Sequence, residues 1–132
     1  MHNAITAHVF VFHILQCLDM TTVIIRKTAD GVYKGFTCMG HAGFAGRGRD
    51  IICASVSALV INTINSMEKL AGEEPEVTTD EETGFIQCRF LHPLSHEGAL
   101  FMDSMVLGLS GIAEEYGRKR GKKYLVLNFE EV

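Results

Sequence analysis

The sequence predicts an α+β fold in two layers, with two helices packed on a mainly antiparallel sheet in the order ββαββαβ. Three observations support this prediction. Short extended runs come in pairs separated by glycine-containing turns, as in β-hairpins. Each pair is followed by a long segment with apolar residues at helical spacing. A last extended run closes the chain, which at 132 residues is long enough for one domain with one core.

Residues with strong local preferences bound the elements of the first half. Asp30-Gly31 favours a tight turn between two strands, because glycine accepts positive φ. Asp50 is a suitable N-cap for the first helix, and Gly72 is its predicted end. In chain order we expect strands over 22–28 and 32–39, a helix over 51–71, strands near 76–81 and 85–91, a helix over roughly 96–119, and a strand over 123–129.

The second half follows the same logic. Residues 73–82 are rich in Asp and Glu, and a solvated loop with an edge hairpin explains them better than a docking site for a basic partner. Thr83-Gly84 marks the turn of that hairpin. Ser95 opens the second helix, whose last turn would place Glu114 four residues before Arg118 as a favourable pair.

Composition limits the classes of function. Hydrophobic residues make up 47% of the chain and charged residues 21%, which is typical of a globular protein. The formal net charge of −4 argues against direct binding of nucleic acid. Residues 1–19 have an apolar middle, but they lack the basic start of a signal peptide and are too short to span a membrane. We therefore expect residues 20–132 to form the working domain and residues 1–19 to be an extension outside it.

The cysteine pattern indicates a reducing compartment. Four cysteines are present, at 17, 38, 53 and 88, and they form no CxxC pair and no recognisable disulfide framework. Without a secretion signal, the expected location is the cytoplasm, where the thiols stay free. Cys38 and Cys88 have the character of small buried strand residues.

The segment GHAGFAGRGRDIICASVSAL, residues 40–59, is the stretch that indicates chemistry. With Asp50 as the cap, Cys53 falls in the first helical turn, where the helix dipole and unpaired backbone N–H groups favour a thiolate and an oxyanion. His41 lies on a glycine-flanked loop and can act as the acid–base partner. Asp50 would orient that imidazole, cap the helix, or do both. Ser57, one turn beyond Cys53, would hydrogen bond substrate or its own backbone.

Two other functions remain open on these residues. A glycine-rich loop that leads into a helix N-terminus, flanked by Arg47 and Arg49, is a natural cradle for a phosphate or for RNA, although no phosphate-binding motif is present. A metal site is the weaker alternative, because its candidate ligands have only superficially suitable spacing. Those ligands are Cys38, His41, His92 and His96.

The same residues resemble the ribosomal-processing cysteine protease family, called Prp. The resemblance covers about 113 residues, from Met20 to Val132, and includes the order of the elements. Its motif is carried by Gly40-His41-Ala42, Gly48, Asp50-Ile51-Ile52-Cys53-Ala54 and Val56-Ser57-Ala58-Leu59. The resemblance implies that His41 is the catalytic histidine, that Cys53 is the nucleophile, and that Asp50 supports them.

The resemblance also implies a substrate and an assembly. Members of the family remove a short N-terminal extension from a large-subunit ribosomal protein, form homodimers and need no cofactor or metal. Their glycine-rich loop resembles a cover that moves when peptide binds, which makes Gly40 and Gly43 candidate substrate-binding residues. Phe44 is a candidate lining residue of the peptide groove, because the family's cleavage site is rich in aromatic residues. A ribosome-associated protein that binds RNA or an anion without turnover is the alternative function.

Overall fold

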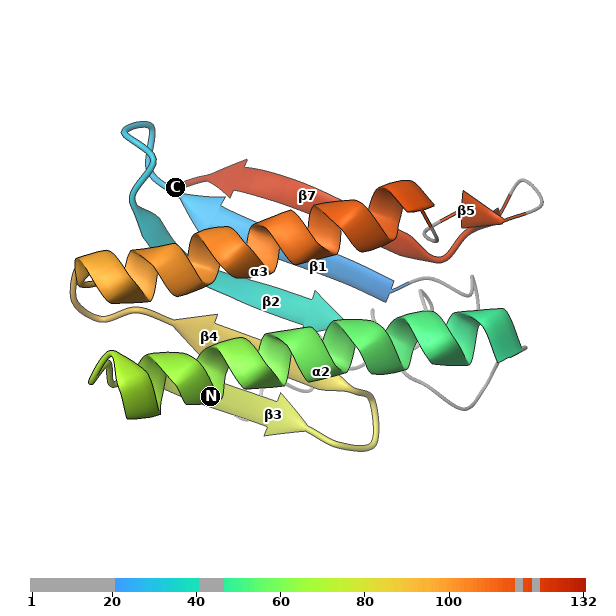
Figure 1. Ribbon diagram of the computed structural model, residues 1–132, viewed down its shortest axis with the longest axis horizontal. Helices are drawn as coiled ribbons and strands as arrows, with labels where there is room; N and C mark the ends of the chain where they lie inside the picture. The colour runs from blue at the N-terminus through green and yellow to red at the C-terminus, as the bar shows by residue number, and fades with distance from the viewer. Residues whose placement is uncertain (1–20, 41–46, 116–117, 120–121) are drawn as a thin grey trace.

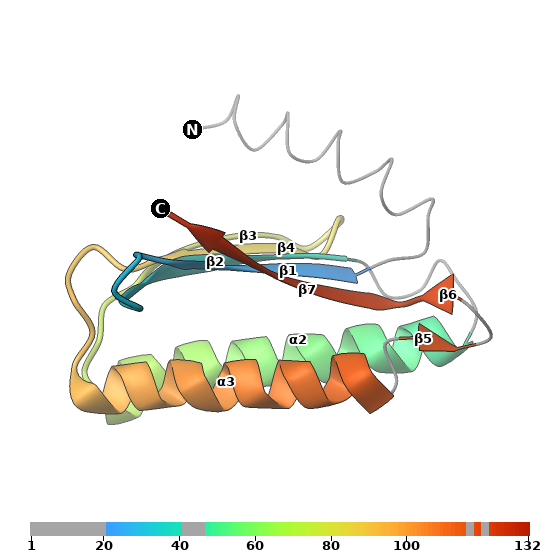
Figure 2. The same ribbon diagram turned by 90° about the horizontal axis from the view of Figure 1, so that it is seen from above.

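The computed structural model describes residues 21–40, 47–115, 118–119 and 122–132. Within them, two helices lie on one face of a five-stranded sheet (Figure 1 and Figure 2). The predicted order ββαββαβ is confirmed, with one short additional hairpin before the last strand. The elements are β1 (Thr21–Lys27), β2 (Tyr33–Met39), α2 (Arg47–Leu70), β3 (Glu76–Asp80), β4 (Phe85–Arg89), α3 (His96–Glu115), β5 (Arg118–Lys119), β6 (Lys122–Lys123) and β7 (Leu125–Glu131).

The sheet is mixed rather than purely antiparallel. Its strand order is β3-β4-β2-β1-β7, and the first three neighbouring pairs are antiparallel. The pair β1–β7 is parallel, with Thr21 opposite Leu125. Gly31 has a φ of 87° in the β1–β2 turn, which explains the glycine there. The acidic segment forms the edge strand β3, as the sequence predicts.

The end of α3 differs from the prediction. The helix ends at Glu115, and Arg118–Lys119 instead form the short strand β5, which pairs with β6. The expected helical pair between Glu114 and Arg118 is therefore wrong. Residues 116–117, which link the helix to β5, lie outside the described residues.

The core lies between the sheet and the two helices. Alternate residues of β1 from Thr21 to Ile25 are buried, and α2 and α3 bury one face each. Side chains with no exposed surface come from both layers: Val23, Ile25, Phe36, Val56, Val60, Met67, Met102, Met105 and Leu109.

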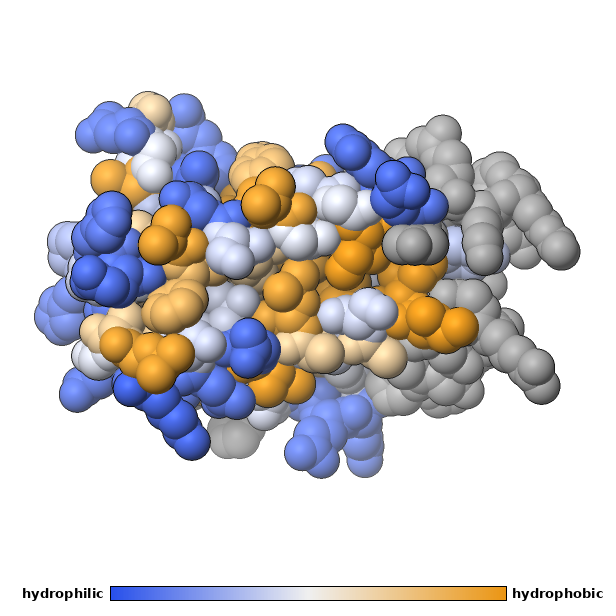
Figure 3. Space-filling view, in the orientation of Figure 1, coloured by the Kyte–Doolittle hydropathy of each residue, from blue (hydrophilic) through white to orange (hydrophobic). Residues whose placement is uncertain are grey.

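The outer face of the helices keeps some apolar side chains. Figure 3 shows apolar side chains among polar ones over the two helices. Leu100 and Leu107 are exposed on α3. Ile51, Ile61 and Leu70 are exposed on α2, so α2 is less deeply buried than its apolar sequence suggests. Among the described helices, Ile51–Leu70 is long and apolar enough to cross a membrane. Its buried residues pack in the core of this domain, which accounts for that composition.

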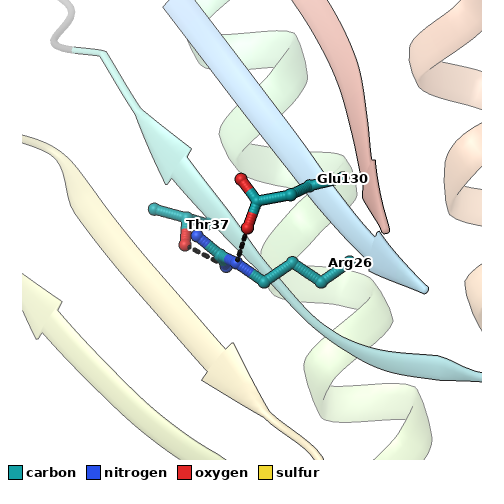
Figure 4. Close-up of polar contacts among 3 residues, drawn as sticks. All are labelled: Arg26, Thr37 and Glu130. Atoms are coloured by element: carbon teal, nitrogen blue, oxygen red, sulfur yellow. Dashed lines mark hydrogen bonds and ion pairs between the residues drawn. The ribbon is translucent and has the colours of Figure 1, made fainter. Parts of the chain in front are cut away.

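A polar cluster links three strands on the sheet face opposite the helices. The Arg26 Nη1 on β1 donates to the Thr37 hydroxyl on β2 at 2.7 Å, and its Nε lies 3.4 Å from the Glu130 carboxylate on β7 (Figure 4). Partly exposed ion pairs contribute about 0–1 kcal/mol each. The cluster therefore helps to fix the register of β1 more than it adds stability.

Candidate active site

The Cys53 sulfur lies where α2 packs against one end of the sheet. Cys53 is on α2 and is only 4% exposed. Its Sγ is 2.8 Å from the Oγ1 of Thr21, the first residue of β1. Thr21 in turn packs against Gly40, since a Cβ added to Gly40 would lie 2.6 Å from Thr21 Oγ1. Gly40 directly precedes His41 in the sequence and is the last described residue before it.

The start of α2 corrects two expectations about this site. The helix begins at Arg47, so Asp50 is the fourth helical residue and not the N-cap. Cys53 is the seventh residue, in the second turn, and its N–H lies beyond the four that a helix start leaves unpaired. The stabilisation of charge by a helix dipole falls off within the first turn. The helix start therefore does not account for an activated thiol, and the Cys53 N–H is not an oxyanion donor.

The sequence misplaces this start because Asp50 is a strong capping signal and Gly48 a weak helix former. Arg47 and Arg49 are good helix formers, and they extend the helix by one turn beyond the expected cap. The anion cradle that they would form with the glycine-rich loop stays a prediction, since that loop lies mostly outside the described residues.

The other described cysteines are free and buried, as predicted. Burial raises the pKa of Cys38 on β2 to about 12, and the nearby Cys53 raises it further in the same direction. Burial, followed by the charge of Glu68, raises the pKa of Cys88 on β4 to about 12. Both thiols therefore stay protonated at neutral pH and are poor nucleophiles.

A groove runs along α2 from the residue one turn after Cys53. It lies between the helix and the β3–β4 hairpin and has a volume of about 470 Å³. Ser57 lines its near end, and Cys53 is not among the described lining residues. The walls combine apolar and acidic side chains: Ile61, Ile64 and Glu68 from the helix, and Val77, Asp80 and Glu81 from the hairpin.

The structure does not describe three of the predicted site residues, and it tests the alternative metal site only in part. His41, Gly43 and Phe44 lie outside the described residues. Among the residues that the structure does describe, no three metal-ligating side chains come together. In particular, Cys38 is buried in the core whereas His92 and His96 are exposed near the start of α3, so these three do not form the alternative metal site.

Thr21 is the site residue that the sequence does not reveal. It is 32 positions from Cys53, and a threonine at the start of a strand is ordinary. Only the packing of β1 against α2 brings the two side chains together. No local motif signals such a contact.

Comparison with known proteins shows the family of this chain. Residues 20–120 match the family model described as cysteine protease Prp. The ribosomal processing cysteine protease Prp of Bacillus subtilis is 33% identical over 101 residues, which cover 74% of this chain and 90% of the relative. The Staphylococcus aureus protein of the same name is 31% identical over 97 residues, covering 74% and 92%.

Solved structures of the S. aureus protease have the same fold. Its complex with a substrate peptide superposes with a TM-score of 0.76 at 28% identity, covering 84% of this chain and 100% of that chain. Its complex with a covalently linked product peptide gives a TM-score of 0.72 at 29% identity, with the same coverage. The segment that matches the family model includes the Thr21–Gly40–Cys53 contact. From the family model and these identities, the chain belongs to the cysteine protease Prp family.

Proposed function

We propose that this cysteine protease removes the short N-terminal extension of a large-subunit ribosomal protein, with Cys53 as nucleophile and His41 as acid–base partner. One observation carries the proposal: Thr21 contacts both the Cys53 sulfur and Gly40, which directly precedes His41. Because His41 directly follows Gly40 in the sequence, its imidazole would be within reach of the sulfur. The ribosomal substrate is supported by the names of the relatives, which are ribosomal processing proteases.

The chemistry would proceed in two steps. The Cys53 thiolate attacks the scissile carbonyl carbon, and the protonated His41 gives its proton to the departing amine as the C–N bond breaks. The result is a thioester between Cys53 and the N-terminal fragment. His41 then takes a proton from water, whose oxygen attacks the thioester and releases the fragment as an acid. Asp50 would orient the imidazole of His41. Because Asp50 is not the N-cap of α2, its carboxylate is not needed for capping.

The substrate peptide would lie in the groove beside α2. Ser57 lines the end of this groove that is nearest to Cys53, at a distance of one helical turn, where it can hydrogen bond the peptide. Because Cys53 is only 4% exposed, the peptide must displace part of the cover over the sulfur before attack. Gly40, Gly43 and Phe44 belong to the segment proposed to move and to line the bound peptide.

The same proposal extends to the protein's setting. The working domain is residues 20–132, and it acts in the cytoplasm, where ribosomal proteins are made and thiols stay reduced. It forms a homodimer and takes its peptide substrate without a cofactor, a metal, a membrane or nucleic acid. Exposed apolar side chains on the helical layer, such as Leu100 and Leu107, are consistent with a partner subunit.

A cleavage assay tests this function. The native protein is incubated with a peptide that carries the source organism's own ribosomal N-terminal extension, and the products are identified by mass spectrometry. Cleavage should occur at one site and be lost by several powers of ten in Cys53→Ala and His41→Ala. Cys88→Ala, which changes a buried thiol on β4, should cleave as the native protein does. Binding without cleavage by the native protein would favour the alternative of a binding protein without turnover.

A further inference from the structure

We propose that Thr21 is a positioning residue for the reaction, whose hydroxyl holds the Cys53 sulfur and stabilises its thiolate. This inference rests on the proposed role of Cys53 as nucleophile. Thr21 is 2% exposed and Cys53 is 4% exposed, so no bulk water competes for the contact. The distance of 2.8 Å between Oγ1 and Sγ is within hydrogen-bonding range.

Contacts on two sides position Thr21. The Thr21 backbone N–H donates to the carbonyl of Tyr124 at 2.9 Å, and the residue pairs with Leu125 on β7. On the other side, Gly40 leaves the space that the threonine side chain fills, since an added Cβ would lie 2.6 Å from its Oγ1 and 2.8 Å from its Cγ2. Pairing with β7 therefore holds the Thr21 backbone beside the sulfur, and the lack of a side chain at Gly40 leaves room for the hydroxyl there.

The chemistry of the pair favours the anion. A thiol can donate or accept a hydrogen bond, but a thiolate can only accept. When Cys53 ionises, Thr21 must be the donor, and a hydrogen bond to a charged group is stronger than one to a neutral group. The contact therefore stabilises the thiolate more than the thiol. The hydroxyl is needed because α2 begins at Arg47, so Cys53 lies in the second turn. The helix dipole stabilises a charge mainly in the first turn and does not account for a thiolate at Cys53.

The test measures the sulfur without any substrate. The rate of Cys53 alkylation by iodoacetamide is followed across pH by peptide mass spectrometry in the native protein, Thr21→Val, Thr21→Ala and Thr21→Ser. Valine keeps the shape of threonine, alanine removes the hydroxyl without adding a methyl group against the sulfur, and serine restores the hydroxyl. Thr22→Val is the matched control, because Thr22 is the next residue of β1 and its side chain points to the opposite sheet face.

We expect the midpoint of alkylation to move to higher pH in Thr21→Val and Thr21→Ala, with alkylation at neutral pH slowed about tenfold. Thr21→Ser and Thr22→Val should retain the native midpoint. In the cleavage assay, the two variants without a hydroxyl should lose kcat with little change in KM. A native midpoint in either Thr21→Val or Thr21→Ala, or a failure of Thr21→Ser to restore it, would overturn the proposal.

The two proposals fail in different ways. Cleavage by Cys53→Ala would refute the proposed nucleophile, whatever the alkylation rates show. Unchanged alkylation in the Thr21 variants, together with loss of cleavage in Cys53→Ala, would refute the role of Thr21 alone.

Discussion

Cys38 and Cys53 are neighbouring buried thiols, and Cys53 has a hydroxyl beside its sulfur. The Thr21 hydroxyl lies 2.8 Å from the Cys53 sulfur. In contrast, burial together with the nearby Cys53 raises the pKa of Cys38 to about 12. We propose that this hydroxyl is what suits Cys53 to chemistry, whereas Cys38 is a protonated thiol of the core.

The thiol of Cys88 makes stability depend on pH in the alkaline range. Its pKa is raised from 9.0 to about 12, so the folded protein keeps a proton that the unfolded chain loses above 9.0. The associated stability is fully present below pH 9.0 and is lost as the pH rises towards about 12. Denaturant unfolding on both sides of pH 9.0 should show a shallower alkaline loss in Cys88→Ala than in the native protein. Equal slopes would contradict this account.

The sequence indicates a functional residue only where that residue belongs to a local motif. The spacing of His41 and Cys53, with glycines around the histidine, makes a Cys–His pair one of three site hypotheses, and the resemblance to the Prp family favours it over the other two. Thr21 escapes such a search because it meets Cys53 only through tertiary packing, across 32 positions of the chain.

At the scale of elements, α3 begins with a cap that links it to the end of α2. The Ser95 Oγ accepts from the Gly98 N–H at 3.1 Å and donates to the Glu73 carboxylate at 2.9 Å. The Ser95 N–H donates to the same carboxylate oxygen at 2.8 Å. The cap thus fixes both the first turn of α3 and its position against the segment after α2.

Ser95→Ala should destabilise the protein by about 1 kcal/mol or slightly more, because the cap is lost and the Glu73 carboxylate loses one donor. Thermal and urea unfolding measure the change. Ser104→Ala is the matched control, since Ser104 is exposed in the middle of the same helix, where alanine is the better helix former. Equal effects of the two substitutions would show that Ser95 is not the cap.

The ends of elements are harder to predict than the elements themselves. The prediction that Ser95 opens α3 is confirmed, whereas the prediction that Asp50 caps α2 is wrong, because that helix begins one turn earlier. An aspartate is favourable in the first turn of a helix as well as at the N-cap, because the positive end of the helix dipole stabilises acidic side chains in both positions. The sequence alone does not separate these two positions.

For the whole molecule, the periodicity of α3 divides core from surface. Met105 has no exposed surface and belongs to the core between the layers, whereas Leu107, two positions on, is 76% exposed. Helical spacing predicts Met105 on the buried face, together with Leu109, and both are buried. The parallel pairing of β7 with β1 does not follow from the sequence, because that contact joins the two ends of the domain.

Met105→Ala should cost about 2–5 kcal/mol, since it removes buried methylene groups and leaves a cavity. Leu107→Ala on the same helix should change stability by no more than about 0.5 kcal/mol. The free energy of unfolding in urea measures both substitutions. A large effect at Leu107 alongside a small one at Met105 would mean that α3 turns the other face to the sheet.

Cys53 is proposed to supply the sulfur that carries the reaction, and titration of the native protein with iodoacetamide tests that role. Cleavage of the extension peptide and the alkylated fraction of each cysteine are measured on the same samples. The loss of activity should equal the fraction of Cys53 alkylated, while Cys38 and Cys88 stay unmodified. Full activity after complete alkylation of Cys53 would contradict the claim.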